Sequence, residues 1–127
     1  MRKIIFIFAI FMATTSTPVQ AATQGSCPKY EAAFKKYGLP VKKFSMISYR
    51  ESRCNPRSIS AIRASTGKPD VGLVQISGSW ATATRTICHV SYKKVIKALT
   101  KVDCNLKVAA YLYKNGGLGH WKATSGK

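Results

Sequence analysis

The sequence predicts a small, mainly α-helical domain with one short irregular or β-hairpin segment between its second and third helices. Hydrophobic residues make up 46% of the 127 residues, which suffices for a packed core and is too many for a disordered chain. Prolines, glycines and capping residues divide most of the chain into helix-length segments. Residues 56–78 are the exception, because glycines and Pro69 interrupt polar stretches there. A chain of this length has room for one compact domain.

The first 21 residues are typical of a secretory signal peptide rather than of a folded domain. A basic start, Met1-Arg2-Lys3, precedes an apolar run over residues 4–13, and small residues surround Ala21. This run is only half as long as the roughly 20 residues that span a bilayer, so we expect cleavage after Ala21 and no membrane anchor. The domain then comprises residues 22–127, and the protein is expected to be secreted or periplasmic.

Helix signals recur along the rest of the chain. Five helices are expected, over residues 26–38, 40–53, 79–86, 91–99 and 103–114. Each range includes the residue that caps or opens the helix and the residue at which it should stop. Residues that can cap or open a helix stand at each start, namely Ser26, Pro40, Ser79, Ser91 and Asp103. The second helix must end before Asn55, because a proline at position 56 disfavours helical geometry in the residue before it.

All four cysteines lie in the part of the chain that would be exported: Cys27, Cys54, Cys88 and Cys104. An even number of cysteines in a small exported domain predicts two disulfides, and the absence of any C-x-x-C pair disfavours a metal site. Three pairings are open, and we favour Cys27 with Cys54 and Cys88 with Cys104. Each bridge would add about 2–4 kcal/mol of stability by restricting the unfolded chain. We expect no metal and no other cofactor.

The charge of the chain indicates an anionic partner. Lys and Arg number 21 against 4 Asp and Glu, which gives a formal charge of +17, and removal of the signal peptide lowers it by two. A field of this strength attracts anionic polymers in a salt-dependent way, and cell-wall material is one such polymer. The export signal and the cysteines disfavour nucleic acid as the partner. Basic residues are also spread along the chain instead of lying on one amphipathic helix, which disfavours a membrane-disturbing protein.

Among the four carboxylates, Glu51 has the least ordinary position. The other three suit a helix start or a turn, whereas Glu51 follows Ile47 by four residues and extends an apolar stripe near the end of the second helix. Burial and a helix carboxyl end both raise the pKa of a carboxyl group, as a general acid near neutral pH requires. Arg50 and Arg53 flank it, so the alternative is a solvated glutamate that pairs with an arginine.

Two motifs resemble those of the soluble lytic transglycosylases. Glu51-Ser52-Arg53-Cys54-Asn55-Pro56 resembles their E-S-x-x-x-P, and Gly72-Leu73-Val74-Gln75-Ile76, about 20 residues later, resembles their G-L-M-Q-I. The surroundings are also similar to chicken-type lysozymes of the same superfamily: Asp70 lies two residues before the second motif, Trp80 follows it, and a glycine-rich stretch leads to Trp121. The late Y-N-x-G motif of the transglycosylases is missing. The resemblance covers residues 41–121 and implies an α+β lysozyme-like fold.

The resemblance also implies roles for the matched residues. Glu51 would be the general acid, and Asp70 would stabilise or covalently trap the sugar cation. Five further residues would contact substrate: Ser52, Gln75, Ser77, Trp80 and Trp121.

The resulting hypothesis is an exported, monomeric muramidase. It would hydrolyse the β-1,4 bond between N-acetylmuramic acid and N-acetylglucosamine in peptidoglycan, without specific binding to nucleic acid. If Asp70 points away from Glu51, the alternative is a lytic transglycosylase that leaves 1,6-anhydro products. A third alternative is a non-catalytic cationic protein that binds cell wall, membrane or nucleic acid.

Overall fold

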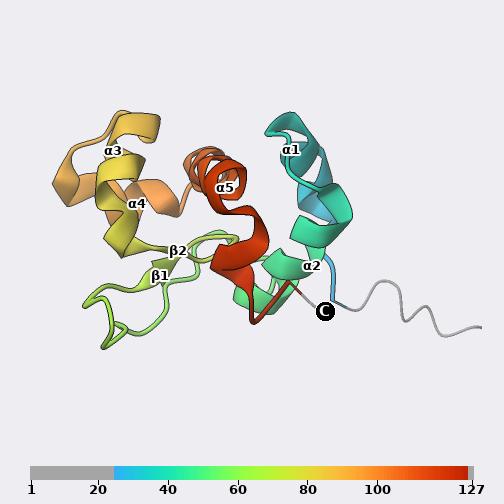
Figure 1. Cartoon of the computed structure of the whole chain (residues 1–127), viewed down its shortest axis with the longest axis horizontal. Coiled ribbons are helices and arrows are strands. Elements are labelled where there is room, and N and C mark those ends of the chain that lie inside the picture. The colour runs from blue at the N-terminus through green and yellow to red at the C-terminus, as the bar shows by residue number, and fades with distance from the viewer. Residues whose placement is uncertain (1–24, 126–127) are drawn as a thin grey trace, which may run out of the picture.

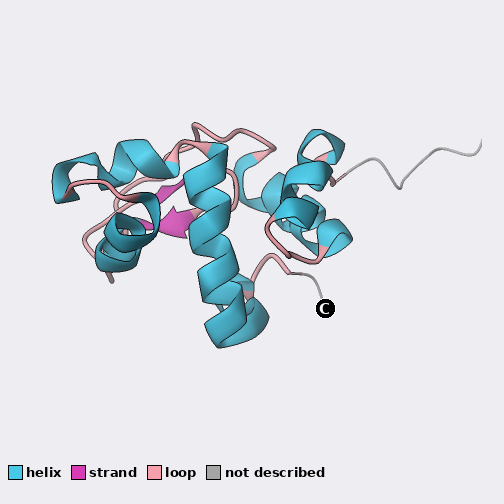
Figure 2. Cartoon of the chain, turned by 90° about the horizontal axis from the view of Figure 1, so that it is seen from above, coloured by secondary structure: helices cyan, strands magenta, loops and turns pink. Residues whose placement is uncertain are grey.

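The computed structural model describes residues 25–125, so the expected signal peptide over residues 1–21 lies outside the described part. Within residues 25–125 the α-helices are α1 (Glu31–Lys36), α2 (Val41–Ser52), α3 (Ala81–Cys88), α4 (Val95–Leu99) and α5 (Val102–Gly116). The short 3-10 helices are η1 (Pro28–Tyr30), η2 (Gly78–Trp80), η3 (Tyr92–Lys94) and η4 (Gly117–Trp121). The predicted mainly α fold is therefore confirmed (Figures 1 and 2). None of the described helices combines the length and apolarity needed to cross a membrane.

The irregular segment between α2 and α3 contains a hairpin of two short strands, β1 (Asp70–Val71) and β2 (Ile76–Ser77). The strands pair antiparallel, with Asp70 opposite Ser77 and Val71 opposite Ile76. The connecting turn uses left-handed backbone at Gly72, where φ is +87°, and at Gln75, where φ is +51°. Asp70 and Ser77 consequently lie next to each other at the end of the hairpin away from the turn.

Helix α5 lies at the centre of the domain, with α1 and α2 on one side and α3 and α4 on the other (Figure 1). Its apolar side chains share one core with α1, α2 and the hairpin. The core includes Phe34, Phe44, Ile47, Val71, Leu106, Leu112 and Trp121. The Phe44 ring contacts Trp121 edge-on at a centroid distance of 5.0 Å, which ties α2 to η4.

Asn105, a fully buried residue of α5, fixes the hairpin turn to this core. Its Nδ2 donates to the carbonyl oxygens of Val71 at 2.9 Å and Leu99 at 3.0 Å, and its Oδ1 accepts from the Val74 amide at 3.1 Å. Gly72 packs directly against it, because a Cβ at that position would lie 2.2 Å from Asn105 Nδ2. The orientation of the hairpin, and with it that of Asp70, thus depends on a contact with the central helix.

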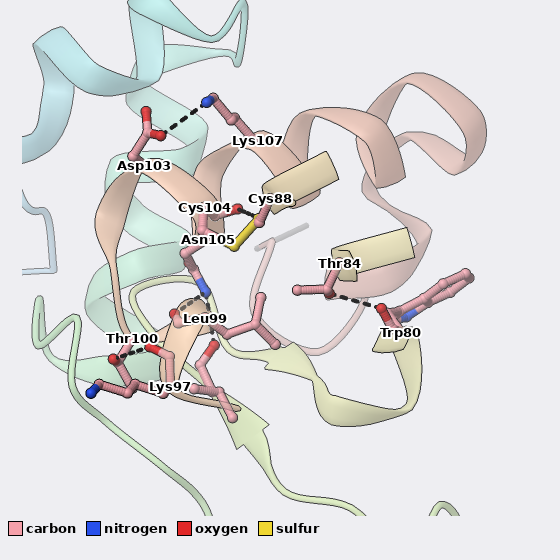
Figure 3. The surroundings of a disulfide bond; sticks show 11 residues. Trp80, Thr84, Cys88, Lys97, Leu99, Thr100, Asp103, Cys104, Asn105 and Lys107 are labelled. Atoms are coloured by element: carbon pink, nitrogen blue, oxygen red, sulfur yellow. Dashed lines mark hydrogen bonds and ion pairs between the residues drawn. A yellow bond between two sulfur atoms is a disulfide. The ribbon is translucent and has the colours of Figure 1, made fainter. Parts of the chain in front are cut away.

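Two disulfides join Cys27 to Cys54 and Cys88 to Cys104, the same pairs that the sequence analysis favours. The first ties the segment before η1 to the turn after α2, three residues beyond Glu51. The second joins the end of α3 to the first turn of α5 (Figure 3). Both bridges therefore fasten peripheral helices to the framework that carries the candidate site.

The predicted caps are wrong at several helix starts. Ser77 rather than Ser79 caps η2, because Ser77 has the extended backbone of a cap and its Oγ accepts from the Ser79 amide at 3.2 Å. Ser26 and Ser91 stand before the 3-10 turns η1 and η3, and neither turn has a side-chain cap. Asp103 lies inside the first turn of α5 instead of preceding it. In three of these cases a 3-10 turn precedes the α-helix, which shifts the start that the sequence suggests.

Candidate active site

Glu51 is half-buried in the last turn of α2 (Val41–Ser52), where it continues the face that buries Phe44 and Ile47. Burial raises the pKa of its carboxyl above the usual 4.5, which is the direction predicted from the sequence. A hydrogen bond from Thr124 opposes this pKa shift, the Asp70 charge adds to it, and the Arg63 charge opposes it. Glu51 therefore keeps its proton to a higher pH than a solvated glutamate, as a proton donor requires.

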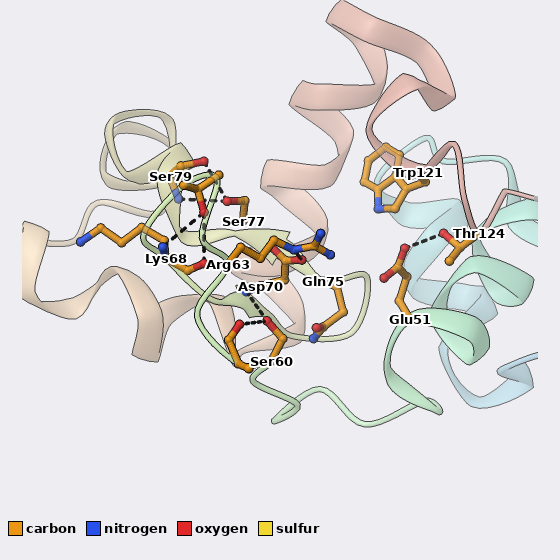
Figure 4. Close-up of polar contacts among 12 residues, drawn as sticks. Glu51, Ser60, Arg63, Lys68, Asp70, Gln75, Ser77, Ser79, Trp121 and Thr124 are labelled. Atoms are coloured by element: carbon orange, nitrogen blue, oxygen red, sulfur yellow. Dashed lines mark hydrogen bonds and ion pairs between the residues drawn. The ribbon is translucent and has the colours of Figure 1, made fainter.

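A segment that follows η4 holds one oxygen of this carboxyl. Thr124 Oγ1 donates to Glu51 Oε1 at 2.5 Å (Figure 4). Two side chains of α2 bind the same segment: Arg50 Nη1 donates to the Thr124 carbonyl and Lys43 Nζ to the Ser125 carbonyl, each at 3.0 Å. Within residues 25–125, Glu51 Oε2 has no hydrogen-bond partner, so this oxygen is available to a substrate.

Asp70 lies on β1 and is not a free carboxylate. Its side chain is 9% exposed, and its Oδ2 forms an ion pair with Nε of Arg63, a residue of the loop between α2 and β1. The loop is held to the strand by Ser60, whose Oγ accepts from the Asp70 amide at 2.8 Å. The charge of Asp70 still raises the pKa of Glu51, so the two carboxyls are electrostatic neighbours. Figure 4 shows Arg63 reaching across Asp70 toward the side on which Glu51 lies.

A cavity of about 330 Å³ is lined by residues of the hairpin, of η2 and of η4. Five residues that the sequence analysis assigned to the site line it: Asp70, Gln75, Ser77, Trp80 and Trp121. Arg63 and His120, which the sequence analysis did not single out for the site, line it as well. Glu51 is not among the lining residues; the turn that follows Trp121 brings Thr124 to its carboxyl instead. Glu51 thus lies beside the cavity, at the margin formed by Trp121 (Figure 4).

The polar groups of the cavity wall are held in place by hydrogen bonds to nearby loops and turns. Gln75 Nε2 donates to the carbonyl oxygens of Ser58 and Gly72, both at 3.0 Å, so the left-handed Gln75 is anchored to the loop and to its own turn. Ser77 Oγ and Ser79 Oγ are 2.8 Å apart and share a hydrogen bond. These side chains form a prearranged polar surface next to Asp70.

The two tryptophans contribute to the wall in different ways. Trp80 is 37% exposed and offers an open aromatic face, which suits stacking against a sugar ring. Trp121 is 3% exposed, and its Nε1 donates to the Val74 carbonyl at 2.9 Å, so most of its surface belongs to the core. His120 lies between them, with edge-on ring contacts of 5.4 Å to Trp80 and 5.8 Å to Trp121.

Ser52, which was expected to contact substrate, has a different environment in the structure. Its side chain is buried, and its Oγ lies 2.7 Å from the Leu73 carbonyl oxygen and 3.0 Å from that of Ser48, which share its one hydroxyl hydrogen. Consecutive helix residues point about 100° apart, so a residue next to Glu51 faces another side of α2. The hydroxyl fastens the end of α2 to the hairpin turn instead of lining the cavity.

No group of three or more His, Cys, Asp or Glu side chains within residues 25–125 is arranged to hold a metal ion. A half-buried glutamate with a raised pKa, beside a second carboxylate and an aromatic-walled cavity, is the arrangement expected of an enzyme that cleaves glycosidic bonds.

The comparison with protein families agrees with this class of enzyme. Residues 29–123 match the family described as the transglycosylase SLT domain, and the chain belongs to this family. Its members are peptidoglycan-cleaving lytic transglycosylases, so the protein is an enzyme and its substrate is peptidoglycan. Neither the curated proteins nor the solved structures that were compared with the chain gave a match. A peptidoglycan substrate and two disulfides together indicate an extracytoplasmic location.

Proposed function

We propose that the protein is an exported lytic transglycosylase in which Glu51 acts first as the general acid and then as the general base. The main support is the carboxyl itself, which is half-buried with a raised pKa, has Oε1 bound by Thr124, and leaves Oε2 facing the site. In this proposal Gln75, Ser77 and Trp80 bind the glycan strand along the cavity. Trp121 excludes water from the margin next to Glu51.

The reaction begins with protonated Glu51. Its proton passes to the glycosidic oxygen, the bond from that oxygen to C1 of N-acetylmuramic acid breaks, and N-acetylglucosamine leaves as an alcohol. The acetamide oxygen of the same muramic acid residue then stabilises C1. Glu51, now a carboxylate, accepts the proton of the C6 hydroxyl while O6 bonds to C1. The product is a 1,6-anhydro sugar, and Glu51 ends the cycle protonated.

The ion pair of Asp70 favours this route over the hydrolysis that the sequence analysis preferred. A retaining hydrolase needs a free carboxylate about 5–5.5 Å from the acid to trap the sugar cation. The Arg63 guanidinium neutralises Asp70 on the cavity side of β1 and weakens it as a nucleophile. The substrate's own acetamide has no such competing partner.

Muramidase activity is the second candidate, because the charge of Asp70 is felt at Glu51. If substrate binding opens the ion pair, Asp70 can stabilise the sugar cation and water can complete the reaction with a reducing end. Arg63 is held to Asp70 from an exposed loop position, with 60% of its side chain exposed.

Digestion of purified peptidoglycan by the wild type and by Glu51→Gln tests the proposal. We expect the wild type to release soluble fragments whose muramic acid ends are lighter than reducing ends by one water molecule in a mass spectrum. Glu51→Gln should release none, because the amide cannot donate an acidic proton. Reducing ends would support the muramidase instead. Equal lysis of cells by both proteins would leave only a non-catalytic cationic protein.

Export and assembly complete the proposal. We infer a mature chain of residues 22–127 that is secreted or periplasmic, acts as a monomer, and is concentrated on the anionic wall by its excess of Lys and Arg. Amino-terminal sequencing of the exported protein should begin at Ala22, and light scattering should give the mass of one chain.

A further inference from the structure

Arg63 has more hydrogen-bonding capacity than its ion pair uses. An arginine side chain has five N–H donors, and the contact with Asp70 engages Nε. Within residues 25–125 neither Nη1 nor Nη2 of Arg63 has a hydrogen-bond partner. The ion pair therefore fixes the direction of the guanidinium, and it leaves the terminal nitrogens in a cavity wall where 60% of the side chain remains exposed.

The surroundings of these nitrogens favour an anionic group of the substrate. Ser65, Thr66 and Ser77 line the same cavity and add hydroxyl groups, and Asp70 is the one carboxylate among its lining residues. Planar carboxylates are the partners that a guanidinium binds in a two-pronged manner. In peptidoglycan the sugar rings, their hydroxyls and their acetamides are neutral, and the carboxylates are carried by the lactyl arm of muramic acid or by the peptide attached to it.

We infer that Arg63 recognises a carboxylate on the lactyl arm or stem peptide of the muramic acid residue, and so selects peptidoglycan over neutral glycans. This inference rests on the proposed function, since it names the chemical group of the substrate that the same cavity would bind. Arg63 would then have two partners at once, Asp70 through Nε and the substrate through Nη1 and Nη2. The Asp70 contact orients the guanidinium before substrate arrives, which lowers the entropy lost on binding.

Binding measurements with inactive protein separate this inference from catalysis. In the Glu51→Gln background, affinity for soluble glycan strands can be measured by calorimetry without turnover, so the result does not depend on which reaction occurs. Strands with stem peptides and strands stripped by an amidase are each compared before and after their carboxylates are converted to neutral amides. The stripped strands present the lactyl carboxylate alone.

We expect Arg63→Gln in this background to weaken binding to carboxylated strands by at least 10-fold, as for loss of charge-assisted hydrogen bonds. On amidated strands the same substitution should change affinity by less than about 2-fold. A loss confined to stem-bearing strands assigns the contact to the peptide. A loss on stripped strands assigns it to the lactyl carboxylate, which is free only where no peptide is attached, and both results support the inference.

Two further variants distinguish a direct contact from long-range attraction and from loss of folding. Lys68→Gln removes one positive charge from the same loop, but Lys68 contacts Tyr92 and lines a neighbouring cavity, so it reports long-range attraction alone. Arg63→Lys keeps a cation beside Asp70 if Arg63→Gln fails to fold, yet lacks the planar fork, and should still weaken binding to carboxylated strands several-fold. Equal losses in Arg63→Gln and Lys68→Gln, or equal losses on carboxylated and amidated strands, would overturn the inference.

Discussion

Thr124 and Glu51, 73 residues apart in the sequence, are joined by a hydrogen bond of 2.5 Å from the threonine hydroxyl to Oε1 of the glutamate. The bond fixes the rotation of the carboxyl, so that the opposite oxygen faces the cavity side (Figure 4). It also favours the ionised form and thus partly opposes the effect of burial on the pKa. In the proposed function, Thr124 is therefore a positioning residue that acts on substrate through Glu51.

Replacement of this hydroxyl should change the pH dependence of the reaction. Thr124→Val removes the donor, so the pKa of Glu51 should rise further and the alkaline limb of activity should move to higher pH, while kcat falls several-fold because the carboxyl is less well oriented. Thr124→Ser keeps the donor and should restore the wild-type profile. The check is the rate of fragment release between pH 4 and 9. Identical profiles for all three proteins would exclude a positioning role.

Removal of the Glu51 charge should stabilise the protein at neutral pH. A carboxyl whose folded-state pKa is raised contributes stability that is present below its ordinary pKa of 4.5 and is lost as the pH rises through the folded-state value. Glu51→Gln stays neutral, so it should melt at a higher temperature than the wild type at pH 7 and at about the same temperature at pH 3.5. Circular dichroism measures both. Glu31→Gln, in the first turn of α1, should give no gain at either pH because a negative charge there is favourable.

Loss of the Asn105 side chain should unfold the hairpin end of the domain. Asn105→Ala removes three buried hydrogen bonds, and we expect it to lower the free energy of unfolding by about 3–5 kcal/mol. Asn115→Ala is the matched control on the same helix, since Asn115 is exposed and donates only to the Tyr111 carbonyl. Urea denaturation compares the two. Similar losses in both variants would contradict a special role for the buried amide.

The two tryptophans should separate binding from stability. Trp80→Ala should raise KM for peptidoglycan about 10-fold and change the unfolding temperature little, because its exposed face is free to stack on a sugar. Trp121→Ala should lower the unfolding free energy by about 3–5 kcal/mol, because a buried ring with a hydrogen bond to Val74 is lost. Steady-state kinetics and denaturation at the same pH distinguish the outcomes. A destabilised Trp80→Ala with unchanged KM would place Trp80 in the core.

Local patterns in the sequence predict the parts of the site that depend on neighbouring residues. Glu51 follows from an apolar stripe that ends in a carboxylate, and the helices follow from their breaks at proline and glycine. Arg63 and Thr124 carry no such signal. Arg63 contacts Asp70 and Thr124 contacts Glu51, and the periodicity of a single helix or strand does not predict a contact between two segments. Ser52 shows the opposite case, since its motif position suggests a site residue but its direction on α2 buries the hydroxyl.

Helix α2 supplies Glu51 and also Lys43 and Arg50, the two cations that grip the segment carrying Thr124. Glu51, the two cations and the segment that carries Thr124 are therefore held together by contacts with a single helix. Asp70 and Arg63 lie on the other side of the cavity, on β1 and in the loop that precedes it. The buried Ser52 hydroxyl nevertheless joins α2 to the Leu73 carbonyl of the hairpin turn, so the two sides of the cavity are tied to each other next to Glu51.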